Sequence, residues 1–245
     1  MKEKQNFLDA LNDWGSILSN TYEAANTFKP ETTYSKYIDG FNNKIIQQRA
    51  YKDSTIKKQL DFDDDIILIN HEAFYNSNFI GQLILPKKLK RLGLGCFSGC
   101  KGLTGDLVIP NAVTDIEAFC FDECVNMKGR LILNNKLTKI NQYTFGNCGF
   151  TGELIIPDNI TVIGYAGFAY CSGFSKLTLS KNISTIEDYA FKGCTGLSGE
   201  LIIPESVEYI GKNAFDGCNF DTIYLPKHFN SHDITKGDKY NIKYY

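Results

Sequence analysis

The sequence has few of the residues and motifs on which catalysis, membrane insertion or nucleic-acid binding usually depends. Its 245 residues include three histidines, and it contains no HExxH motif, no P-loop and no Gly-x-Gly-x-x-Gly motif. No stretch approaches the ~18–20 apolar residues of a membrane-spanning helix. The 26 basic and 28 acidic residues give a net charge of -2, so no excess of charge indicates a nucleic-acid or anionic-membrane partner. These absences disfavour an enzyme, a membrane-spanning protein and a nucleic-acid-binding protein.

Two stretches remain as candidates for metal binding, and neither has a convincing pattern. His228 and His232 would share one face of a helix, but we interpret their segment as a polar cap. The acidic run from Asp61 to Asp65 includes Phe62 and lacks the spacing of a calcium-binding loop, so we interpret it as a solvated edge. No nucleophile is paired with a base. We therefore predict no catalytic residue, no metal and no cofactor.

The first twenty residues, MKEKQNFLDALNDWGSILSN, do not read as a secretory signal. Lysines occur early, but Asp9 and Asp13 interrupt what would have to be an apolar core. On this pattern we expect a protein that is cytoplasmic or associated with a larger assembly.

What the chain has in abundance is a repeat of about 23 residues. Counted from Leu201 as offset 0, apolar residues occupy offsets 2, 6, 9 and 14, a small residue occupies offset 13 and a cysteine occupies offset 17. The same frame fits copies that begin at Leu83, Leu107, Leu131, Leu154 and Leu177, a degenerate copy at Leu60 and a truncated copy at Ile223. Self-similarity at this period is the signature of a solenoid. We assign residues 60–225 to the repeats.

Each repeat contains the pattern of one short strand. Offsets 0 to 2 alternate between inward and outward positions, as in Leu201, Ile202 and Ile203. Proline follows at offset 3 in five copies and ends the strand because it has no N–H group, whereas Asn134 and Ser180 replace it in two others. The rest of the repeat must turn back and bury offsets 6, 9 and 14. We therefore predict parallel strands, with one phenylalanine per repeat forming a stacked spine.

The eight cysteines follow the repeat. Six of them share offset 17, and Cys96 and Cys120 replace the small residue at offset 13. One residue type at one structural position indicates packing, because cysteine behaves as a small buried apolar group. Two alternatives stay open: a zinc site formed by Cys96, Cys100, Cys120 and Cys124, and disulfides between neighbouring coils. We favour reduced thiols in the core.

The two ends of the chain do not fit the repeat. In residues 1–59, one amphipathic stripe is formed by Phe7, Leu11, Trp14, Leu18 and Tyr22, and another by Tyr34, Tyr37, Ile38, Phe41 and Ile45. These predict a helical hairpin that caps the apolar end of the solenoid, as repeat arrays require, or that anchors the protein. In residues 226–245, the alternation of Ile234, Tyr240, Ile242 and Tyr244 predicts a closing strand or hairpin.

The repeat resembles the BspA-like, or Treponema-type, leucine-rich repeat, through the leucine, proline, phenylalanine and cysteine positions described above. This resemblance implies an α/β solenoid: a right-handed array with a parallel sheet on its concave face, and irregular or short helical segments behind the sheet. It also implies a non-enzymatic binding protein, because members of the family are often adhesins on cell surfaces. A location on the cell surface follows from the resemblance alone.

The candidate site is the concave sheet face. Its central outward column, at offset 1, consists of Ile84, Val108, Ile132, Ile155, Thr178, Ile202 and Tyr224. The residues just before each strand include Arg130, Glu153, Lys176 and Glu200. An apolar stripe beside mixed charges is typical of a protein-binding face, although β-branched residues also favour strands for their own sake.

Two functions fit these observations. The first is a non-catalytic interaction or adhesion module that binds a protein or cell-surface partner through the concave face. The alternative is a structural component that residues 1–59 dock into a larger assembly, such as a virion or a surface layer, with the repeats as a projecting spacer.

Overall fold

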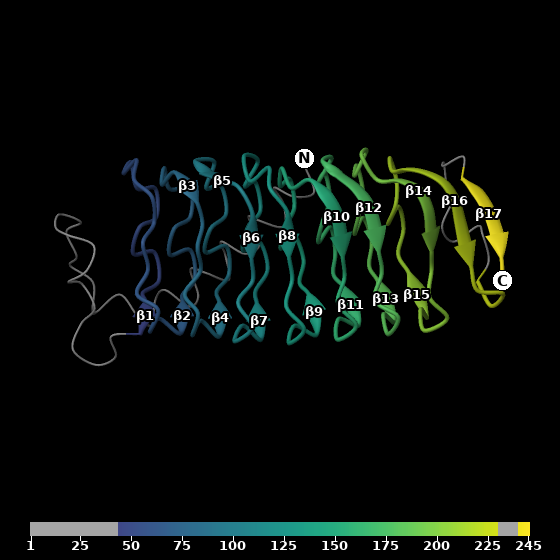
Figure 1. Ribbon diagram of the computed structural model, residues 1–245, viewed down its shortest axis with the longest axis horizontal. Helices are drawn as coiled ribbons and strands as arrows, with labels where there is room; N and C mark the ends of the chain where they lie inside the picture. Colours follow the sequence, from purple (N-terminus) through teal and green to yellow (C-terminus); the bar gives the residue numbers. More distant parts are fainter. Residues whose placement is uncertain (1–43, 230–239) are drawn as a thin grey trace. The chain divides into compact units, whose positions relative to one another are not determined.

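The described residues form a parallel β-solenoid of about eight turns. The computed structural model describes residues 44–229 and 240–245. In this part the coils lie side by side from β1 to β17 (Figure 1), and every strand pair is parallel. The predicted solenoid with parallel strands is confirmed. The described residues contain strands and turns but no helix, and so no helix long and apolar enough to cross a membrane.

The first column of strands lies at or just before the triplets predicted from the repeat. Its strands are β3 (Gly81–Gln82), β5 (Leu103–Thr104), β6 (Leu107–Val108), β8 (Leu131–Ile132), β10 (Gly152–Ile155), β12 (Phe174–Thr178), β14 (Ser198–Ile202), β16 (Asn219–Leu225) and β17 (Asn241–Tyr244). Of these, β6, β8, β10, β12, β14 and β16 include offsets 0 and 1, whereas β3 and β5 end before offset 0. Equivalent repeat positions pair, so that Val108 lies opposite Ile132 and Ile155 opposite Thr178. We call the outer surface of this column the strand face.

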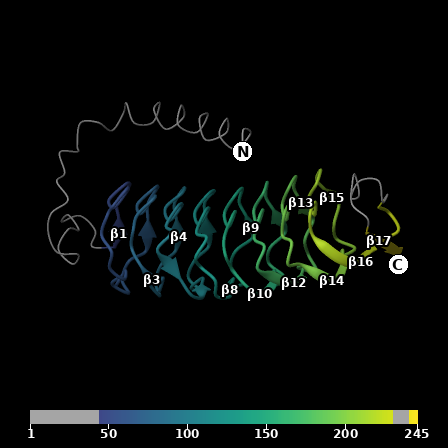
Figure 2. The ribbon, with the colours of Figure 1, turned by 90° about the horizontal axis from the view of Figure 1, so that it is seen from above.

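A second column of strands was not predicted. It consists of β1 (Ile45–Ile46), β2 (Leu68–Ile69), β4 (Arg91–Leu92), β7 (Asp115–Ile116), β9 (Lys139–Ile140), β11 (Val162–Ile163), β13 (Thr185–Ile186) and β15 (Tyr209–Ile210). These strands occupy offsets 8 and 9, on a different side of the coils from the first column (Figure 2). Each pairs with its equivalent one coil away, as Ile163 does with Ile186, and so satisfies its backbone groups. This second column, which forms two four-stranded sheets, takes the place of the short helical segments that the resemblance implied.

A pair of left-handed residues in each coil explains why no helix forms behind the sheet. Positive φ angles recur at offsets 12 and 16, for example at Gly95 (57°) and Gly99 (72°). The same offsets in another coil hold Tyr189, at 60°, and Gly193, at 71°. An L-residue in this region interrupts a right-handed helix. The segment between the two columns therefore forms consecutive tight turns, and the predicted α/β class is wrong for the described residues.

The core matches the predicted inward positions. The phenylalanines of offset 14 stack from coil to coil, with ring centroids 5.0–5.6 Å apart and ring planes within 10° of parallel. This spine consists of Phe74, Phe97, Phe121, Phe145, Phe168, Phe191 and Phe215. Each ring is at most 1% exposed. Complete burial of one such side chain contributes roughly 2–3 kcal/mol, so the predicted spine is a main source of stability.

The cysteines of offset 17 add a ladder of hydrogen bonds to this core. All eight cysteines are buried and free. Each thiol at offset 17 donates to the carbonyl oxygen of the spine phenylalanine in the preceding coil. The Sγ–O distances are 2.9 Å for Cys100 to Phe74, 3.2 Å for Cys124 to Phe97, 3.0 Å for Cys148 to Phe121, 2.9 Å for Cys171 to Phe145, 3.1 Å for Cys194 to Phe168 and 3.3 Å for Cys218 to Phe191. Offset 17 therefore favours a small side chain that packs in the core and also donates a hydrogen bond.

Native thiols are expected to resist labelling because of this burial. Burial raises the pKa of Cys100 to about 12 and raises the pKa values of Cys120, Cys124, Cys148 and Cys194 well above the usual range. The reactive thiolate is then scarce at neutral pH. A chromogenic thiol reagent should label none of the eight cysteines in the folded protein and all eight in urea. Rapid labelling of the folded protein would contradict the buried ladder.

Asn134 shows why asparagine can replace the proline that ends a strand. Its side-chain oxygen accepts hydrogen bonds from the backbone N–H groups of Lys136 (2.8 Å) and Leu137 (3.1 Å). Its amide nitrogen donates to the carbonyl oxygens of Pro110 and Val113 in the preceding coil. A local side-chain bond of this kind stabilises the turn as proline does through its ring. Asparagine in place of proline at offset 3 therefore preserves the turn that ends the strand.

The N-terminal end of the array differs from the prediction where the two can be compared. Ile45 was assigned to the second amphipathic helix, but Ile45 and Ile46 form β1, which pairs with β2. Tyr51 stacks on Phe74, with centroids 5.0 Å apart, and so extends the spine by one coil. The pattern that predicted a helix at residue 45 was misleading, and solenoid pairing begins ahead of residue 60. The rest of the predicted hairpin lies outside the described residues.

At the other end, the expected closing strand is present as β17, which pairs with β16. Ile234 and His232 lie outside the described residues. Tyr240 donates from its hydroxyl to the carbonyl oxygen of Phe215 at 2.5 Å and also packs beside Phe220. The last rung thus continues the parallel pairing of the coils before it.

A charged cluster links three coils along the second column. The carboxylate of Glu117 lies 3.0 Å from His71 Nε2 and pairs with Arg91, and it accepts a 2.8 Å hydrogen bond from the backbone N–H of Leu94. Burial raises the pKa of this carboxyl, but the hydrogen bonds and charges of His71 and Arg91 outweigh burial and lower the pKa to about 2. Ionised Glu117 therefore connects the coils.

This lowered pKa predicts a pH-dependent stability. Unfolding returns Glu117 to its ordinary value near 4.5, so its contribution is complete above about pH 4.5 and is lost as the pH falls toward 2. Glu117→Gln should lower the free energy of unfolding at pH 6 and have a smaller effect at pH 2.5, as measured by urea denaturation. An equal loss at both pH values would exclude this role. Glu208→Gln, at an exposed glutamate, is the control.

Candidate functional site

The strand face carries an exposed apolar column at offset 1. The five aliphatic members are 40–62% exposed, whereas the leucine just before each of them is at most 4% exposed; for example, Ile84 is 62% exposed between Leu83 (2%) and Leu85 (5%). Thr178 is also exposed and Tyr224 is half-buried. The strand alternation thus places one outward residue on each coil. We call Ile84, Val108, Ile132, Ile155, Thr178, Ile202 and Tyr224 the outward column.

The charges beside the outward column are paired from coil to coil. Arg130 contacts Asp106, with Nη2 and Oδ2 3.3 Å apart. Lys176 Nζ lies 2.9 Å from Glu153 Oε1, and the same oxygen accepts a 2.8 Å hydrogen bond from Thr178. The Lys176 hydrogen bond, followed by that of Thr178, lowers the pKa of Glu153. Opposite charges therefore alternate and neutralise each other along this flank.

The last pair extends this arrangement toward the C-terminal end. Tyr224 donates from its hydroxyl to Glu200 Oε1 at 2.9 Å. Exposed pairs of these kinds contribute little to stability, because water screens them. Their larger effect is on the surface, because they leave the apolar column beside a flank with little net charge.

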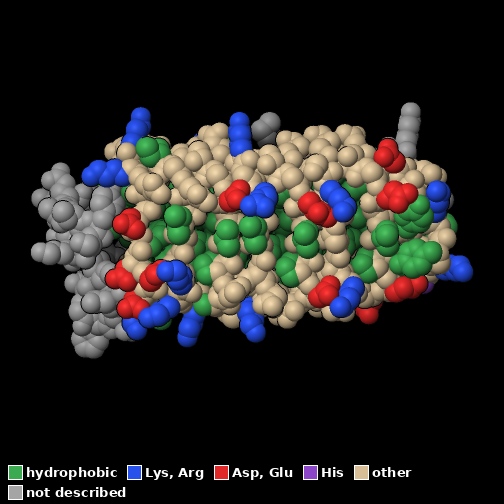
Figure 3. All heavy atoms as spheres, in the orientation of Figure 1, with side chains coloured by type: hydrophobic (Ala, Val, Ile, Leu, Met, Phe, Trp, Pro, Cys, Tyr) green, Lys and Arg blue, Asp and Glu red, His purple; other side chains and the backbone are tan. Residues whose placement is uncertain are grey.

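The outward column forms part of an apolar band on the surface of the solenoid. Hydrophobic side chains form a band along the middle of the strand face, and acidic and basic side chains gather on both sides of it (Figure 3). Contiguous exposed apolar patches of this kind mark interaction sites more often than scattered apolar residues do. All the partner-binding residues predicted from the sequence lie in the outward column or on its charged flank. Their part in binding stays a prediction.

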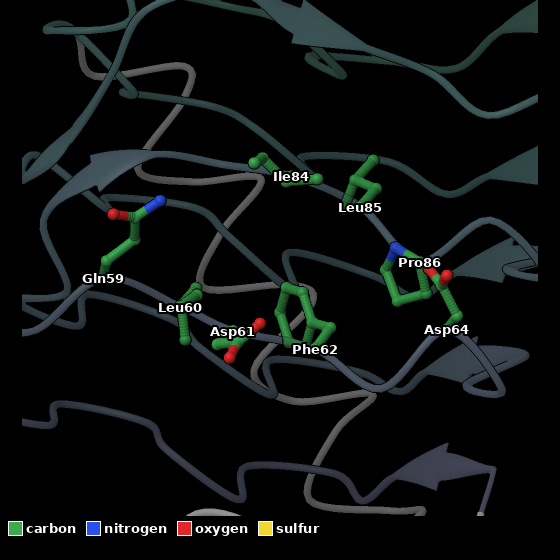
Figure 4. Close-up of a pocket in the computed structure, with 8 residues that line it drawn as sticks. All are labelled: Gln59, Leu60, Asp61, Phe62, Asp64, Ile84, Leu85 and Pro86. Carbon is green, nitrogen blue, oxygen red and sulfur yellow. The ribbon is translucent and has the colours of Figure 1, made fainter.

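A hollow that the sequence did not predict lies at the N-terminal end of this band. It has a volume of about 410 Å³ and is lined by Gln59, Leu60, Asp61, Phe62, Asp64, Ile84, Leu85 and Pro86 (Figure 4). Ligand pockets typically occupy ~300–1,000 Å³. No strand forms at residues 59–63, so the first coil does not pair closely with the next on this side. Phe62, predicted to point inward, is only partly buried and lines the hollow.

The acidic run beside the hollow is mostly paired, as expected for a solvated edge. Asp64 Oδ2 lies 2.7 Å from Lys87 Nζ, and Asp65 pairs with Lys88. Asp63 accepts a hydrogen bond from the backbone N–H of Asp65. Among residues 44–229 and 240–245 no group of three or more His, Cys, Asp or Glu residues could hold a metal ion.

His228, at the other end of the solenoid, contacts protein groups. Its Nε2 lies 3.0 Å from the carbonyl oxygen of Val207, and its Nδ1 lies 3.8 Å from a carboxylate oxygen of Glu205. The interpretation of the segment that holds His228 and His232 as a polar cap stays a prediction.

Comparison with known proteins gives a family for this architecture. The family model for the BspA type leucine rich repeat region matches residues 25–148 and 116–235, with six copies. A leucine-rich repeat protein from Bacteroides ovatus is 21% identical, with a TM-score of 0.43 over 82% of this chain and 75% of that chain. A leucine rich cell surface protein from Faecalibacterium prausnitzii is 19% identical, with a TM-score of 0.45 over 82% of this chain and 69% of that chain. No curated protein matches.

Proposed function

The chain belongs to the BspA-type leucine-rich repeat family, and from this premise we propose that it is a non-catalytic module that binds a protein or cell-surface partner through its strand face. Leucine-rich repeat proteins generally mediate protein interactions. In a solenoid, each coil presents one residue of a column at a spacing of ~4.8 Å, which suits recognition of an extended or repetitive surface.

The observation that carries the proposal is the exposure of the outward column. Five isoleucine and valine side chains, each 40–62% exposed, occur in one line on one face. Strand propensity alone would be met equally well by threonine, which exposes a hydroxyl group. The cost of leaving large aliphatic groups in water is recovered when a partner covers them. The paired charges beside the outward column also support partner binding through the strand face, because they present little electrostatic barrier to an apolar contact.

Photo-crosslinking in the source cells tests this proposal. Benzoylphenylalanine in place of Ile155, which is 54% exposed on the strand face, should form an adduct with a partner protein. The same group in place of Tyr209, which is 52% exposed in the second column, is the matched control and should not. Adducts from position 209 alone, or the same adducts from both positions, would contradict binding through the strand face.

A further inference from the structure

The outward column has a charged residue at each end. Asp61 occupies offset 1 of the first repeat, one coil before Ile84. At the other end, β17 pairs with β16 so that Lys243 lies opposite Tyr224 and continues the column by one rung. Between these ends, every member of the outward column is uncharged. The line of outward residues therefore runs from a carboxylate, over an apolar centre, to an ammonium group.

Asp61 differs from the other acidic residues around the band. The carboxylates of Asp64, Asp106, Glu153 and Glu200 each contact a donor on the next coil. Asp61 is exposed and makes no hydrogen bond or ion pair with another residue of the described part of the chain. It lines the hollow together with the partly buried Phe62 ring (Figure 4). Within the described part of the chain, this end therefore combines an unpaired carboxylate with a hollow of about 410 Å³ that both polar and apolar side chains line.

Lys243 provides the opposite charge at the far end. Its side chain is exposed, and its Nζ lies 5.4 Å from the centroid of the Tyr224 ring. An exposed cation–π contact of this kind is weak, so the ammonium group stays able to meet a carboxylate. Among the described residues, no acidic side chain forms an ion pair with Lys243.

We propose that the strand face binds a polypeptide segment in one fixed direction, with a basic side chain of the partner in the hollow at Asp61 and an acidic side chain at Lys243. This rests on the proposed function and specifies the partner's chemistry. From Ile84 to Lys243 the column has eight rungs and seven intervals of ~4.8 Å, and Asp61 lies one coil beyond Ile84, which puts the two charges roughly 40 Å apart. An extended segment spans this distance with roughly 12 residues at ~3.3 Å each. The aliphatic part of a lysine or arginine would pack on Phe62 and Leu85, while its head group meets Asp61.

The test begins with peptides selected on the full chain. A phage-displayed library of random 14-residue peptides is expected to yield binders with an apolar centre, a basic residue near one end and an acidic residue near the other. Each binder is synthesised in two forms, as selected and with its two charged residues exchanged. Asp61→Asn and Lys243→Gln should each weaken the selected form about fivefold, the effect of one exposed ion pair of ~1 kcal/mol.

Exchange of the charges on the protein is the decisive step. The double variant Asp61→Lys/Lys243→Asp should bind the exchanged peptide better than the selected one, the reverse of the wild-type preference. Lys90→Glu/Glu208→Lys makes the same exchange between two exposed residues of the offset 7 column and should leave the preference unchanged. Proteins that discriminate through charged ends owe that selectivity to repulsion as well as attraction.

The outcomes separate this inference from the proposed function. If peptide binding is lost in Ile132→Asp/Ile155→Asp but is indifferent to both charge exchanges, the polarity is wrong and the strand face remains the binding surface. If peptides bind the Ile132→Asp/Ile155→Asp variant as well as the wild type, both proposals fail. If the library yields no binder, recognition of a short segment is excluded.

Discussion

The double variant Ile132→Asp/Ile155→Asp is expected to lose binding to the crosslinked partner by about a thousandfold. Interface positions that carry most of the energy cost at least ~2 kcal/mol each when altered, and two of them amount to about 4 kcal/mol. Aspartate adds the cost of burying a carboxylate against an apolar surface. Both side chains point away from the core, at 40% and 54% exposure, so the variant should fold. Isothermal titration calorimetry measures the loss.

A matched variant shows whether the position or the added charge is responsible. Tyr209→Asp introduces one carboxylate at a comparably exposed apolar residue of the second column. It should leave the affinity unchanged. If the Ile132 and Ile155 variant keeps full affinity while its urea midpoint is that of the wild type, binding does not use the centre of the outward column.

Phe168→Ala should lower the free energy of unfolding by roughly 3–5 kcal/mol, the usual cost of removing a buried phenylalanine ring. Phe168 is 0% exposed and stacks between Phe145 and Phe191, with centroids 5.4 Å away on each side. Truncation leaves a cavity in the middle of the spine. Because each coil packs only on its neighbours, the loss should also uncouple the two halves of the array. Urea denaturation, followed by tyrosine and tryptophan fluorescence, measures both effects.

Phe62→Ala is the control for the spine. Phe62 is only partly buried and contacts the spine at its edge, 5.7 Å from the Phe74 centroid at 77°. Its truncation should therefore cost clearly less than that of Phe168. Equal losses for the two variants, or a negligible loss for Phe168→Ala, would show that the stacked rings do not hold the coils together.

The features of the fold that could be predicted are those that recur at the same offset. Offsets 0 and 2, occupied by Leu201 and Ile203 in one copy, hold apolar residues in every copy of the repeat. Offset 1, occupied by Ile202, lies between them, so the alternation alone predicted the strand and the outward column. Phe215 and its equivalents were predictable as a spine for the same reason. The second strand column was missed because only two residues per coil form each strand, as Tyr209 and Ile210 do, and two residues carry no periodicity.

The first coil and the hollow could not be predicted for a different reason. Tyr51 replaces the phenylalanine of the repeat, and Ile45 also fits the spacing of an amphipathic helix, so a local pattern competed with the weaker repeat. The hollow forms because residues 59–63 do not pair as a strand with the next coil. It is lined by residues of two coils, so the pattern within one repeat does not predict it. The charge of the run from Asp61 to Asp65, which supplies three of the residues that line the hollow, indicates only a solvated edge. The place of Lys243 at the end of the outward column follows only from the register in which β17 pairs with β16, which the repeat does not predict.

The measurement that tests the strand face most directly is methyl NMR of isoleucine-labelled protein during titration with the partner. We predict that the δ1 methyl signals of Ile84, Ile132, Ile155 and Ile202, which point outward from the strand face, shift or broaden most. Signals of Ile156 and Ile203, which alternate with them and are at most 2% exposed, should change little, as should those of Ile163 and Ile186 in the second column. If the largest changes occur in the second column and the four outward methyls stay unperturbed, the partner binds elsewhere and the account is wrong.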